Sequence, residues 1–383
     1  MKTKEFFFWT LTPLVLASCS SSKQLPPPAP VVITHVVYAP GENLTALTKV
    51  HETNYNCDYP NGGNNGRNLF YIVTDSQTGY SNIYRKNSIT DGSMYEITGG
   101  NNRHSSPSYC EKTNQVYFDG KPQGNSVSDI YMTNATSGGA LTQITNTPGQ
   151  EEHYPCISND GRLLVYEKKS RGANNKDTQI WIKNINTNED IMLGLGRHPS
   201  FSPDGSKIVF VRYASSTYNT YLCVMNSNGS NQMQLTDPGN GNVWHPHFSP
   251  DGRKIVFQWK KPEKGDDDIY VIPVSGNRPE QLTMNKSYDG EPFWANDGSI
   301  YFTSDRGGRD GHYQIWKFKY GNNGGEATIG ISPQQSRIHV VQRGETITDI
   351  ARRYNITVKN IVQWNDLRTM TISQGMKLKV SAP

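Results

Sequence analysis

Short runs of β-branched and aromatic residues, separated by turn-forming residues, recur along most of this chain of 383 residues. The stretch that begins at His198 reads HPSFSPDGSKIVFV, and the stretch that begins at His245 reads HPHFSPDGRKIVFQ. In both, a short strand leads into a Ser-Pro-Asp-Gly turn, in which proline fixes its own φ and glycine takes the left-handed conformation. A β-branched strand follows the turn. The pattern therefore predicts the same β-hairpin twice.

Six copies of this unit can be counted when its first proline is used as the reference position. The copies are spaced 47, 48, 44, 47 and 46 residues apart, and their prolines are Pro60, Pro107, Pro155, Pro199, Pro246 and Pro292. Two further segments keep the same period: a strand-like segment such as QIWIKN, and an Ile-Thr or Leu-Thr pair such as Leu235-Thr236. Each unit thus predicts four antiparallel strands in about 45 residues, the size of a propeller blade.

The six units predict a ring of six blades, because no blade can bury both of its faces alone. The last unit lacks its Leu-Thr strand, whereas the segment LTALTKV at residues 44–50 precedes the first reference proline as an unassigned strand. We expect this N-terminal strand to complete the last blade and to remove the strand edges that an open ring would expose.

The repeated line P-x-F-S-P-D-G-x-x-I-x-F, with I-Y-x-M-N and Q-L-T, resembles the repeat of TolB-like (PD40-type) propellers over residues 44–325. The resemblance implies a mainly β fold with a six-bladed propeller. TolB carries an α/β domain ahead of its propeller, and this chain leaves no room for one. Contacts that TolB makes through that domain are therefore not expected here.

The hydrophobic pattern changes at residues 338–383, where it predicts strand, helix, helix and strand. Thr346 and Thr357 stand where each helix would begin and can cap it. The segment resembles a LysM domain, a small α+β fold of βααβ order. It matches V-x-x-G-D-T-L-x-x-I-A-x-x-Y with Glu345 and Ile347 in place of the usual Asp and Leu, and it also matches N-x-L and G-x-x-L-x-V.

The LysM resemblance implies binding of the N-acetylglucosamine backbone of peptidoglycan or chitin. The family's shallow groove lies between the first strand–helix loop and the second helix–strand loop. The corresponding residues are Gly344, Glu345, Thr346, Ile347, Asn365, Asp366, Leu367, Thr371 and Ile372. A LysM fold that has lost glycan binding is the alternative.

The N-terminus has the features of a targeting segment. Lys2 and Lys4 precede the apolar run FFFWTLTPLVLA, which suits the core of a signal peptide. The sequence LASC resembles a bacterial lipobox, which implies cleavage before Cys19 and lipidation of its thiol, and Ser20 points to the outer membrane. An ordinary secretory peptide is the alternative.

These segments predict five regions along the chain. They are a lipoprotein signal peptide at 1–18, a lipidated, Ser- and Pro-rich tether at 19–43, the propeller at 44–325, a linker at 326–337 and the LysM domain at 338–383.

Composition and charge exclude two classes of protein. The hydrophobic fraction is 34%, too low for a polytopic membrane protein. Residues 338–383 contain seven basic and three acidic residues, which account for the whole net charge of +4. The propeller region is therefore balanced in charge, and we expect no nucleic-acid partner.

The sequence offers few candidates for catalysis. It contains no G-x-S-x-G, H-E-x-x-H or C-x-x-C pattern. Histidines fall just before four of the reference prolines, and Glu291 takes that place in the last copy. We expect these side chains near one mouth of the central channel: His104, His153, His198, His245 and Glu291.

The offset of these residues from their proline varies from one to three positions, which argues against symmetric metal ligation. We therefore expect no metal, no cofactor and no catalysis. Some lyases with related propellers hold manganese through channel histidines, so a carbohydrate-active lyase directed to the wall by LysM is the alternative. A disulfide between Cys110 and Cys156 would be allowed in an exported protein, but two buried thiols are favoured.

Together these features predict a lipid-anchored protein on the periplasmic side of the outer membrane. Its LysM domain would bind peptidoglycan, and the propeller mouth would present a docking face to an envelope protein. TolB pairs with Pal, a peptidoglycan-binding lipoprotein, and this chain would combine the tether and the propeller. Besides the lyase, a surface-exposed glycan-capture lipoprotein is the other alternative.

Overall fold

The computed structural model divides the chain into two compact units, Met1–Asn323 and Gly324–Pro383. The residues that it describes are 45–49, 55–62, 68–87, 94–122, 124–262, 265–276, 278–306, 312–320, 338–341, 345–353, 358, 361–362, 365, 367 and 372–380. The predicted signal peptide, tether and linker lie outside these residues. Among the described residues, no helix has the length and apolar character needed to cross a bilayer.

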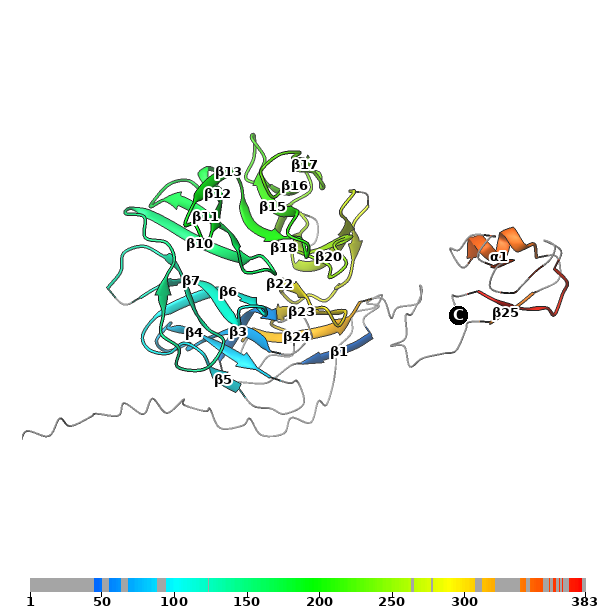
Figure 1. The fold of residues 1–383 in the computed structure, drawn as a ribbon, viewed down its shortest axis with the longest axis horizontal. Coiled ribbons are helices and arrows are strands. Elements are labelled where there is room, and N and C mark those ends of the chain that lie inside the picture. Colours follow the sequence, from blue (N-terminus) through cyan, green and yellow to red (C-terminus); the bar gives the residue numbers. More distant parts are fainter. Residues whose placement is uncertain are drawn as a thin grey trace, which may run out of the picture. The chain divides into compact units, whose positions relative to one another are not determined.

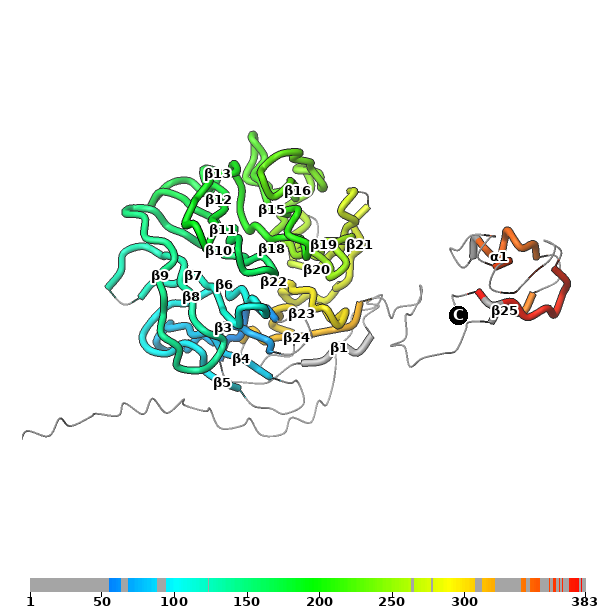
Figure 2. Tube along the Cα trace, in the orientation of Figure 1, coloured from blue at the N-terminus to red at the C-terminus, as the bar shows by residue number. Residues whose placement is uncertain are grey.

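The described part of the first unit forms six four-stranded antiparallel blades that follow one another around a ring (Figures 1 and 2). A single parallel pairing of Ser81 with Arg103 joins the first two blades into one eight-stranded sheet. The innermost strands are β2 (Asn56–Gly62), β6 (Arg103–Cys110), β10 (Gln150–Ile157), β14 (Arg197–Phe201), β18 (Asn242–Phe248) and β22 (Asp289–Trp294). The second strands are β3 (Leu69–Thr74), β7 (Gln115–Lys121), β11 (Leu163–Ser170), β15 (Lys207–Tyr213), β19 (Lys254–Lys260) and β23 (Ser299–Ser304).

The outer half of each blade is made by a third strand and a fourth one, which is shorter in every blade except the third. The third strands are β4 (Ser81–Lys86), β8 (Asp129–Asn134), β12 (Gln179–Asn184), β16 (Thr220–Asn226), β20 (Asp267–Pro273) and β24 (Gln314–Lys319). The outermost strands are β5 (Met94–Glu96), β9 (Thr142–Gln143), β13 (Asp190–Leu195), β17 (Met233–Gln234), β21 (Glu280–Gln281) and β1 (Thr45–Lys49). A short 3-10 helix, Asn175–Asp177, precedes β12.

The predicted N-terminal clasp is confirmed. Strand β1 pairs with β24 in antiparallel fashion, with Thr45 opposite Lys319 and Lys49 opposite Trp316. The sixth blade therefore has the order β1-β24-β23-β22, so it takes its outermost strand from the beginning of the chain (Figure 1). The two ends of the propeller sequence thus meet in one sheet, which closes the ring.

The repeated Ser-Pro-Asp-Gly line is a turn held by its own side chains. The Ser202 hydroxyl donates to Asp204 Oδ1 at 2.6 Å, and Gly205 has a φ of +71°. The same serine–aspartate bond closes the turns at Ser249 and Asp251. Because these contacts are internal to the hairpin, the repeated line is a building block rather than a chemical site.

The repeated Leu-Thr or Ile-Thr pair also has a structural role. In four blades the threonine hydroxyl oxygen accepts a backbone N–H from the third strand of the same blade, at 2.8 to 2.9 Å. The donor and acceptor pairs are Ile83 and Thr98, Ile130 and Thr145, Leu222 and Thr236, and Ile269 and Thr283. The threonine thus satisfies a buried amide where the outermost strand ends.

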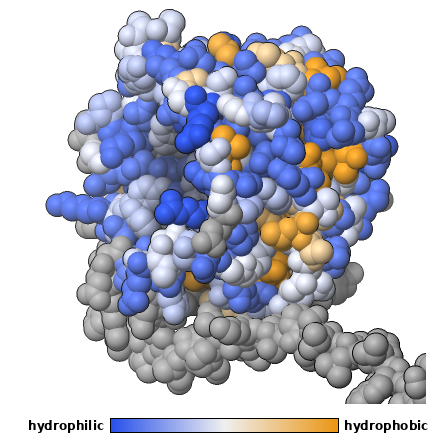
Figure 3. All heavy atoms as spheres, turned by 90° about the vertical axis from the view of Figure 1, so that its left-hand side faces the viewer, coloured by the Kyte–Doolittle hydropathy of each residue, from blue (hydrophilic) through white to orange (hydrophobic). Residues whose placement is uncertain are grey.

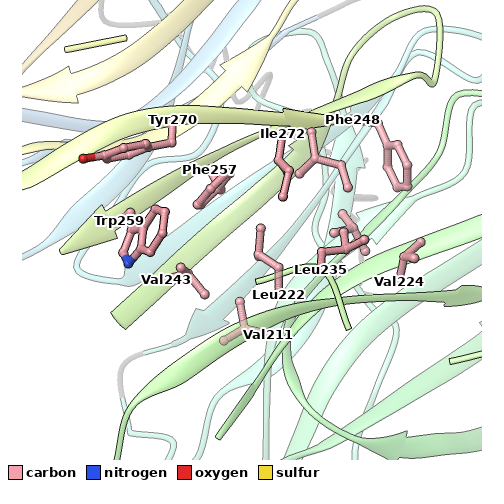
Figure 4. Packing of buried hydrophobic residues seen from close by; sticks show 12 residues of the cluster. Val211, Leu222, Val224, Leu235, Val243, Phe248, Phe257, Trp259, Tyr270 and Ile272 are labelled. Atoms are coloured by element: carbon pink, nitrogen blue, oxygen red, sulfur yellow. The ribbon is translucent and has the colours of Figure 1, made fainter. Parts of the chain in front are cut away.

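Hydrophobic side chains fill the space between neighbouring blades. Between the fourth and fifth blades, Leu222 and Val211 face Phe257 and Ile272, and all four side chains are buried (Figure 4). Burying one such side chain contributes about 1.5–3 kcal/mol. Polar residues cover most of the face in Figure 3, with apolar residues gathered in separate patches. The core is therefore a ring of interfaces, each shared by two blades.

The second unit has a small core of its own. Strand β25 (Ile338–Val340) pairs with β26 (Lys377–Lys379), and the helix α1 (Ile347–Arg353) follows β25. Its buried residues are Val341, Ile347, Ile350, Ala351, Ile361, Leu378 and Val380. The Thr346 oxygen accepts the N–H of Asp349 at 3.2 Å, which confirms Thr346 as the N-terminal cap of the helix.

Replacing the threonine of one blade tests the role of the repeated pair. Thr145→Val keeps the shape of the side chain but leaves the Ile130 N–H without its acceptor, so unfolding should become easier by about 1–3 kcal/mol. Urea denaturation would measure the change. The exposed Thr142→Val in the same blade is the matched control and should shift stability by less than about 0.5 kcal/mol. Equal effects of both variants would contradict this role.

Candidate functional site

Each innermost strand has a bulge at the residue before its reference proline. These residues have positive φ, which is uncommon outside glycine: Tyr59 (51°), Ser106 (48°), Tyr154 (51°), His198 (49°), His245 (49°) and Glu291 (45°). The ladder to the second strand changes register at the same six places. A bulge redirects the side chain that it carries, so the repeat delivers one such side chain per blade to the channel.

A side chain from the preceding blade accepts the backbone N–H at several of these bulges. Asp119 Oδ1 accepts from Tyr154 at 3.3 Å, and Gln258 Oε1 accepts from Glu291 at 3.3 Å. A carboxylate oxygen of Glu167 accepts from His198. These three acceptors occupy the same position on their second strands, so the bulges are tied to the neighbouring blade.

The fourth blade departs from this pattern and uses a histidine instead. Its second strand carries Val211 at that position, which cannot accept a hydrogen bond. His198 Nδ1 accepts the N–H of His245 at 3.1 Å in its place. His198 thus belongs both to the channel lining and to the network that holds the next bulge.

The channel contains two cavities between the six innermost strands. The first, of about 100 Å³, is lined by the six bulge residues, the six prolines and residues just after them. The second, of about 70 Å³, lies toward the Ser-Pro-Asp-Gly turns. Residues that line both are Asn61, Ser108, Cys156 and His247.

Four rings from four blades meet at the first cavity. The imidazoles of His198 and His245 stack with centroids 4.2 Å apart and planes 8° from parallel. Tyr154 lies against His198 at 4.2 Å, and its hydroxyl is 3.2 Å from the hydroxyl of Tyr59. The Tyr59 ring in turn meets His245 edge to face at 5.6 Å. The cavity therefore has an aromatic wall.

The hydrogen-bond network sets the proton positions on the two histidines. Gln258 Nε2 donates to Asp267, which fixes the amide so that its oxygen accepts from His245 Nδ1 at 3.0 Å. His245 Nε2 is then an acceptor. Because His198 Nδ1 accepts an N–H, the proton of neutral His198 is on Nε2. Both Nε2 atoms are buried and have no hydrogen-bond partner in the described residues.

Burial keeps both histidines neutral. It lowers the pKa of His245 to about 4, against the weaker opposing effect of its bond to Gln258. The pKa of His198 is lowered well below its ordinary value, first by burial and then by the neighbouring His245. At neutral pH the pair supplies one donor and one acceptor and no charge.

Two carboxyl groups belong to the sixth and first blades. One oxygen of Glu291 accepts from the Tyr288 hydroxyl, and the other oxygen is buried near the Thr303 hydroxyl without a hydrogen bond of ordinary length in the described residues. Asp58, on the adjoining blade, also has a buried oxygen of this kind. Burial raises the pKa of both groups, and the nearby charge of Glu291 raises that of Asp58 further. Among the described residues, the site thus lacks a cationic side chain to pair with these two carboxyl groups.

The structure brings three of the five predicted channel residues together: His198, His245 and Glu291. It places the other two elsewhere, because they precede their prolines by more than one residue. His104 is buried beside Thr98, with its Nδ1 2.9 Å from the hydroxyl, and His153 pairs with Asp119 at 3.2 Å. Neither lines the channel cavities.

Sequence reasoning missed the two tyrosines and the acceptors behind the bulges. Tyr59 and Tyr154 could have been found by holding the offset from the proline at one residue. The acceptors Asp119, Glu167 and Gln258 share a second signal, since each directly follows an aromatic residue in the middle of the second strand. Both signals become visible when the six sequence repeats are aligned residue by residue.

The predicted glycan-binding residues of the second unit differ in accessibility. Thr346 is exposed, whereas Ile347 is buried and could contribute only through its backbone. Glu345 pairs with His339 Nε2 at 2.7 Å, and Asn365 Nδ2 donates to the Ile361 carbonyl at 2.8 Å. Residues that pack against the core are Leu367 and Ile372. Residues outside the described part are Gly344, Asp366 and Thr371.

The described residues show neither the disulfide considered above nor a cluster of metal-binding side chains. Cys110 and Cys156 are not joined by a disulfide, and both are thiols. Within the described ranges, no group of three or more His, Cys, Asp or Glu side chains is placed to hold a metal ion.

The model of the TolB beta propeller domain (PD40) matches residues 42–244 and 198–377, which together span most of the chain. The chain belongs to this family. Its membership agrees with the six blades, and the expectation of a TolB-like propeller is confirmed.

Solved TolB structures share the propeller fold at low sequence identity. TolB from Acinetobacter baumannii is 16% identical with a TM-score of 0.53, and the likeness covers 67% of this chain and 65% of that protein. A protein assigned as TolB from Agrobacterium tumefaciens is 20% identical with a TM-score of 0.52, covering 71% of this chain and 92% of that one. At these identities the likeness shows the fold alone.

A curated relative matches a short stretch. Membrane-bound lytic murein transglycosylase D of Escherichia coli (strain K12) is 35% identical over 51 residues. The match covers 13% of this chain and 11% of the transglycosylase. This chain therefore spans only a small part of that relative's length.

The channel histidines predict a dependence of stability on pH. Burial lowers the pKa of His247 from its ordinary 6.5 to about 4. The unfolded chain thus binds a proton at a higher pH than the folded chain. The contribution of His247 to stability is complete above pH 6.5 and is lost, by about 3 kcal/mol, as the pH falls to about 4.

His247→Asn keeps a donor for the Phe248 carbonyl but cannot titrate in this range. The stability difference between wild type and variant should therefore shift by about 3 kcal/mol in favour of the variant between neutral pH and pH 4. Urea denaturation at several pH values would measure it. Parallel stability curves for the two proteins would contradict a neutral, buried His247.

Proposed function

We propose that this protein is a non-catalytic tether of the cell envelope. Its second unit binds peptidoglycan, its propeller offers a docking face to an envelope protein, and a lipid on Cys19 holds it on the periplasmic side of the outer membrane. The observation that carries the proposal is the joining, in one chain, of a TolB-type propeller and a separate small unit with a LysM-like sequence.

Several features of the second unit support glycan binding. The pairing of β25 with β26, the cap at Thr346 and the core beneath α1 agree with the first strand, the first helix and the last strand of the βααβ order expected of LysM. A short stretch of the chain is similar to a protein whose name states that it acts on murein. The net charge of +4 in residues 338–383 would also favour an anionic wall polymer.

The binding groove would lie at the loop before α1 and the loop that precedes β26. Thr346 is exposed at the first loop, and Glu345 is held there by its pairing with His339. Backbone amides and such small polar groups suit the acetamido group of N-acetylglucosamine. Gly344, Asp366 and Thr371 would complete the groove.

The rigidity of the propeller supports a role in docking a protein partner. Each bulge at the channel is fixed by a proline and, at several blades, by a side chain of the neighbouring blade. Loops from all six blades converge at each mouth of the channel. A surface that is ordered before binding loses less entropy on association, which favours a specific protein partner.

Removal of residues 338–383 should abolish binding to the wall. We expect the full-length mature protein to sediment with purified peptidoglycan and the truncated protein to remain in the supernatant. The thermal unfolding of the propeller should be unchanged, because the two units have separate cores. Co-sedimentation at low and high salt would separate glycan recognition from simple charge attraction. Equal sedimentation of both proteins would overturn the wall-binding role.

Replacement of the lipidated cysteine should release the protein from the membrane. In cells treated with lysozyme to remove the wall, the wild-type protein should fractionate with membranes and incorporate labelled fatty acid. Cys19→Ala should do neither, since one thiol carries the anchor. A Cys19→Ala protein that still pellets with membranes would contradict the lipid anchor while leaving wall binding untouched.

A further inference from the structure

The innermost strands carry five carboxylates, and three of them have a cationic partner. Glu151 pairs with Lys169 at 3.7 Å, and Glu152 pairs with Lys168 at 3.8 Å. Asp289 pairs with the buried Arg306. The remaining two, Asp58 and Glu291, have no cationic partner among the described residues; Glu291 lines the first channel cavity, and Asp58 directly precedes Tyr59, which also lines it.

The other charged groups around the cavity are already matched. Glu167 is paired with Arg197 at 3.1 Å, and Asp267 lies 3.6 Å from Lys260. Asp119 is paired with His153. The two histidines that line the same cavity, His198 and His245, are neutral. No described cation is therefore left to balance Glu291, and burying an unbalanced carboxylate is costly.

The cavity also presents buried polar atoms that make no hydrogen bond of ordinary length within the described residues. Glu291 Oε2 and His245 Nε2 are buried acceptors, with the Thr303 hydroxyl near Glu291; His198 Nε2 carries a proton and is a buried donor, 3.7 Å from Glu167 Oε1. His198 is 7% exposed. The aromatic rings of Tyr59 and Tyr154 lie beside these atoms and can contact a cation through their faces.

We propose that this cavity binds a small primary amine that carries a neutral hydroxyl or carbonyl oxygen. The ammonium group would donate to Glu291 and His245, and the oxygen would accept from His198. This site does not depend on the tether function, because it is built from channel residues of the propeller alone.

The cavity selects against other ligand classes. An anion would meet the carboxyl group of Glu291 with no cation to balance it, and a zwitterion would place its own carboxylate in the same surroundings. A neutral ligand would leave the charge of Glu291 unbalanced. A volume of about 100 Å³ admits a molecule of only a few heavy atoms. The chemistry therefore points to a compact amino alcohol or amino amide.

Ethanolamine and ethylene glycol are a matched pair of probes, since they differ mainly in replacing an ammonium by a hydroxyl group. We expect the full mature chain to bind ethanolamine in an NMR titration at pH 8 and constant ionic strength, and to bind ethylene glycol much more weakly. Glycinamide should bind as ethanolamine does, and glycine should not. Calcium chloride tests an inorganic cation at the same site.

Glu291→Gln keeps the size of the side chain and removes its charge. It should weaken ethanolamine binding by about tenfold or more, because a charge-assisted bond is lost. Asp58→Asn is an independent second variant and should also weaken binding. Both should remain as stable as wild type at pH 8, since each removes a buried charge. Glu189→Gln makes the same change on an exposed hairpin and should bind normally.

Equal affinity of ethanolamine and ethylene glycol would overturn the proposal, as would full affinity in a folded Glu291→Gln protein. Displacement of ethanolamine by millimolar calcium, with calcium bound more tightly, would assign the site to a metal ion instead. These ethanolamine results do not depend on whether the chain binds peptidoglycan. Either proposal can therefore be overturned while the other stands.

Discussion

Every blade of this propeller depends on a neighbour to bury its second face. The hydrophobic clusters are shared between adjacent sheets, as between the fourth and fifth blades around Phe257 and Leu222. Six such interfaces exist only if the ring closes, and closure rests on the antiparallel pairing of β1 with β24. Five residues near the start of the chain therefore complete a structure of more than 250 residues.

Much of this fold could be predicted from the sequence because each blade is formed mostly by one continuous repeat, and the repeat occurs six times. The period of the prolines, the Ser-Pro-Asp-Gly turns and the orphaned N-terminal strand together predict the ring and its clasp. Ser202 and Thr145 each make a hydrogen bond within one blade. The same residue types therefore recur at the equivalent positions of other repeats that make the same bond. The repeats therefore made the overall topology predictable from patterns within about 45 residues.

The channel was harder to predict because its side chains come from different blades and depend on backbone conformation. A residue before proline normally prefers extended backbone, yet here it takes the left-handed region. That choice separates His198 and His245, which enter the channel, from His104 and His153, which do not. The polar acceptors behind the bulges, such as Gln258 with the N–H of Glu291, meet their partners across a blade boundary that no short window of sequence contains.

The closure of the ring has a mechanical consequence if the chain is held at both ends. Strand β1 begins at Thr45 and β24 ends at Lys319, and these two residues lie opposite each other in the ladder of the sixth blade. Tension between membrane and wall would therefore act at one end of the β1–β24 pair and open its hydrogen bonds in succession, rather than loading them all at once. Under load, the propeller would lose its clasp first and its ring afterwards, so the sixth blade would serve as a weak link that responds to force between the two layers of the envelope.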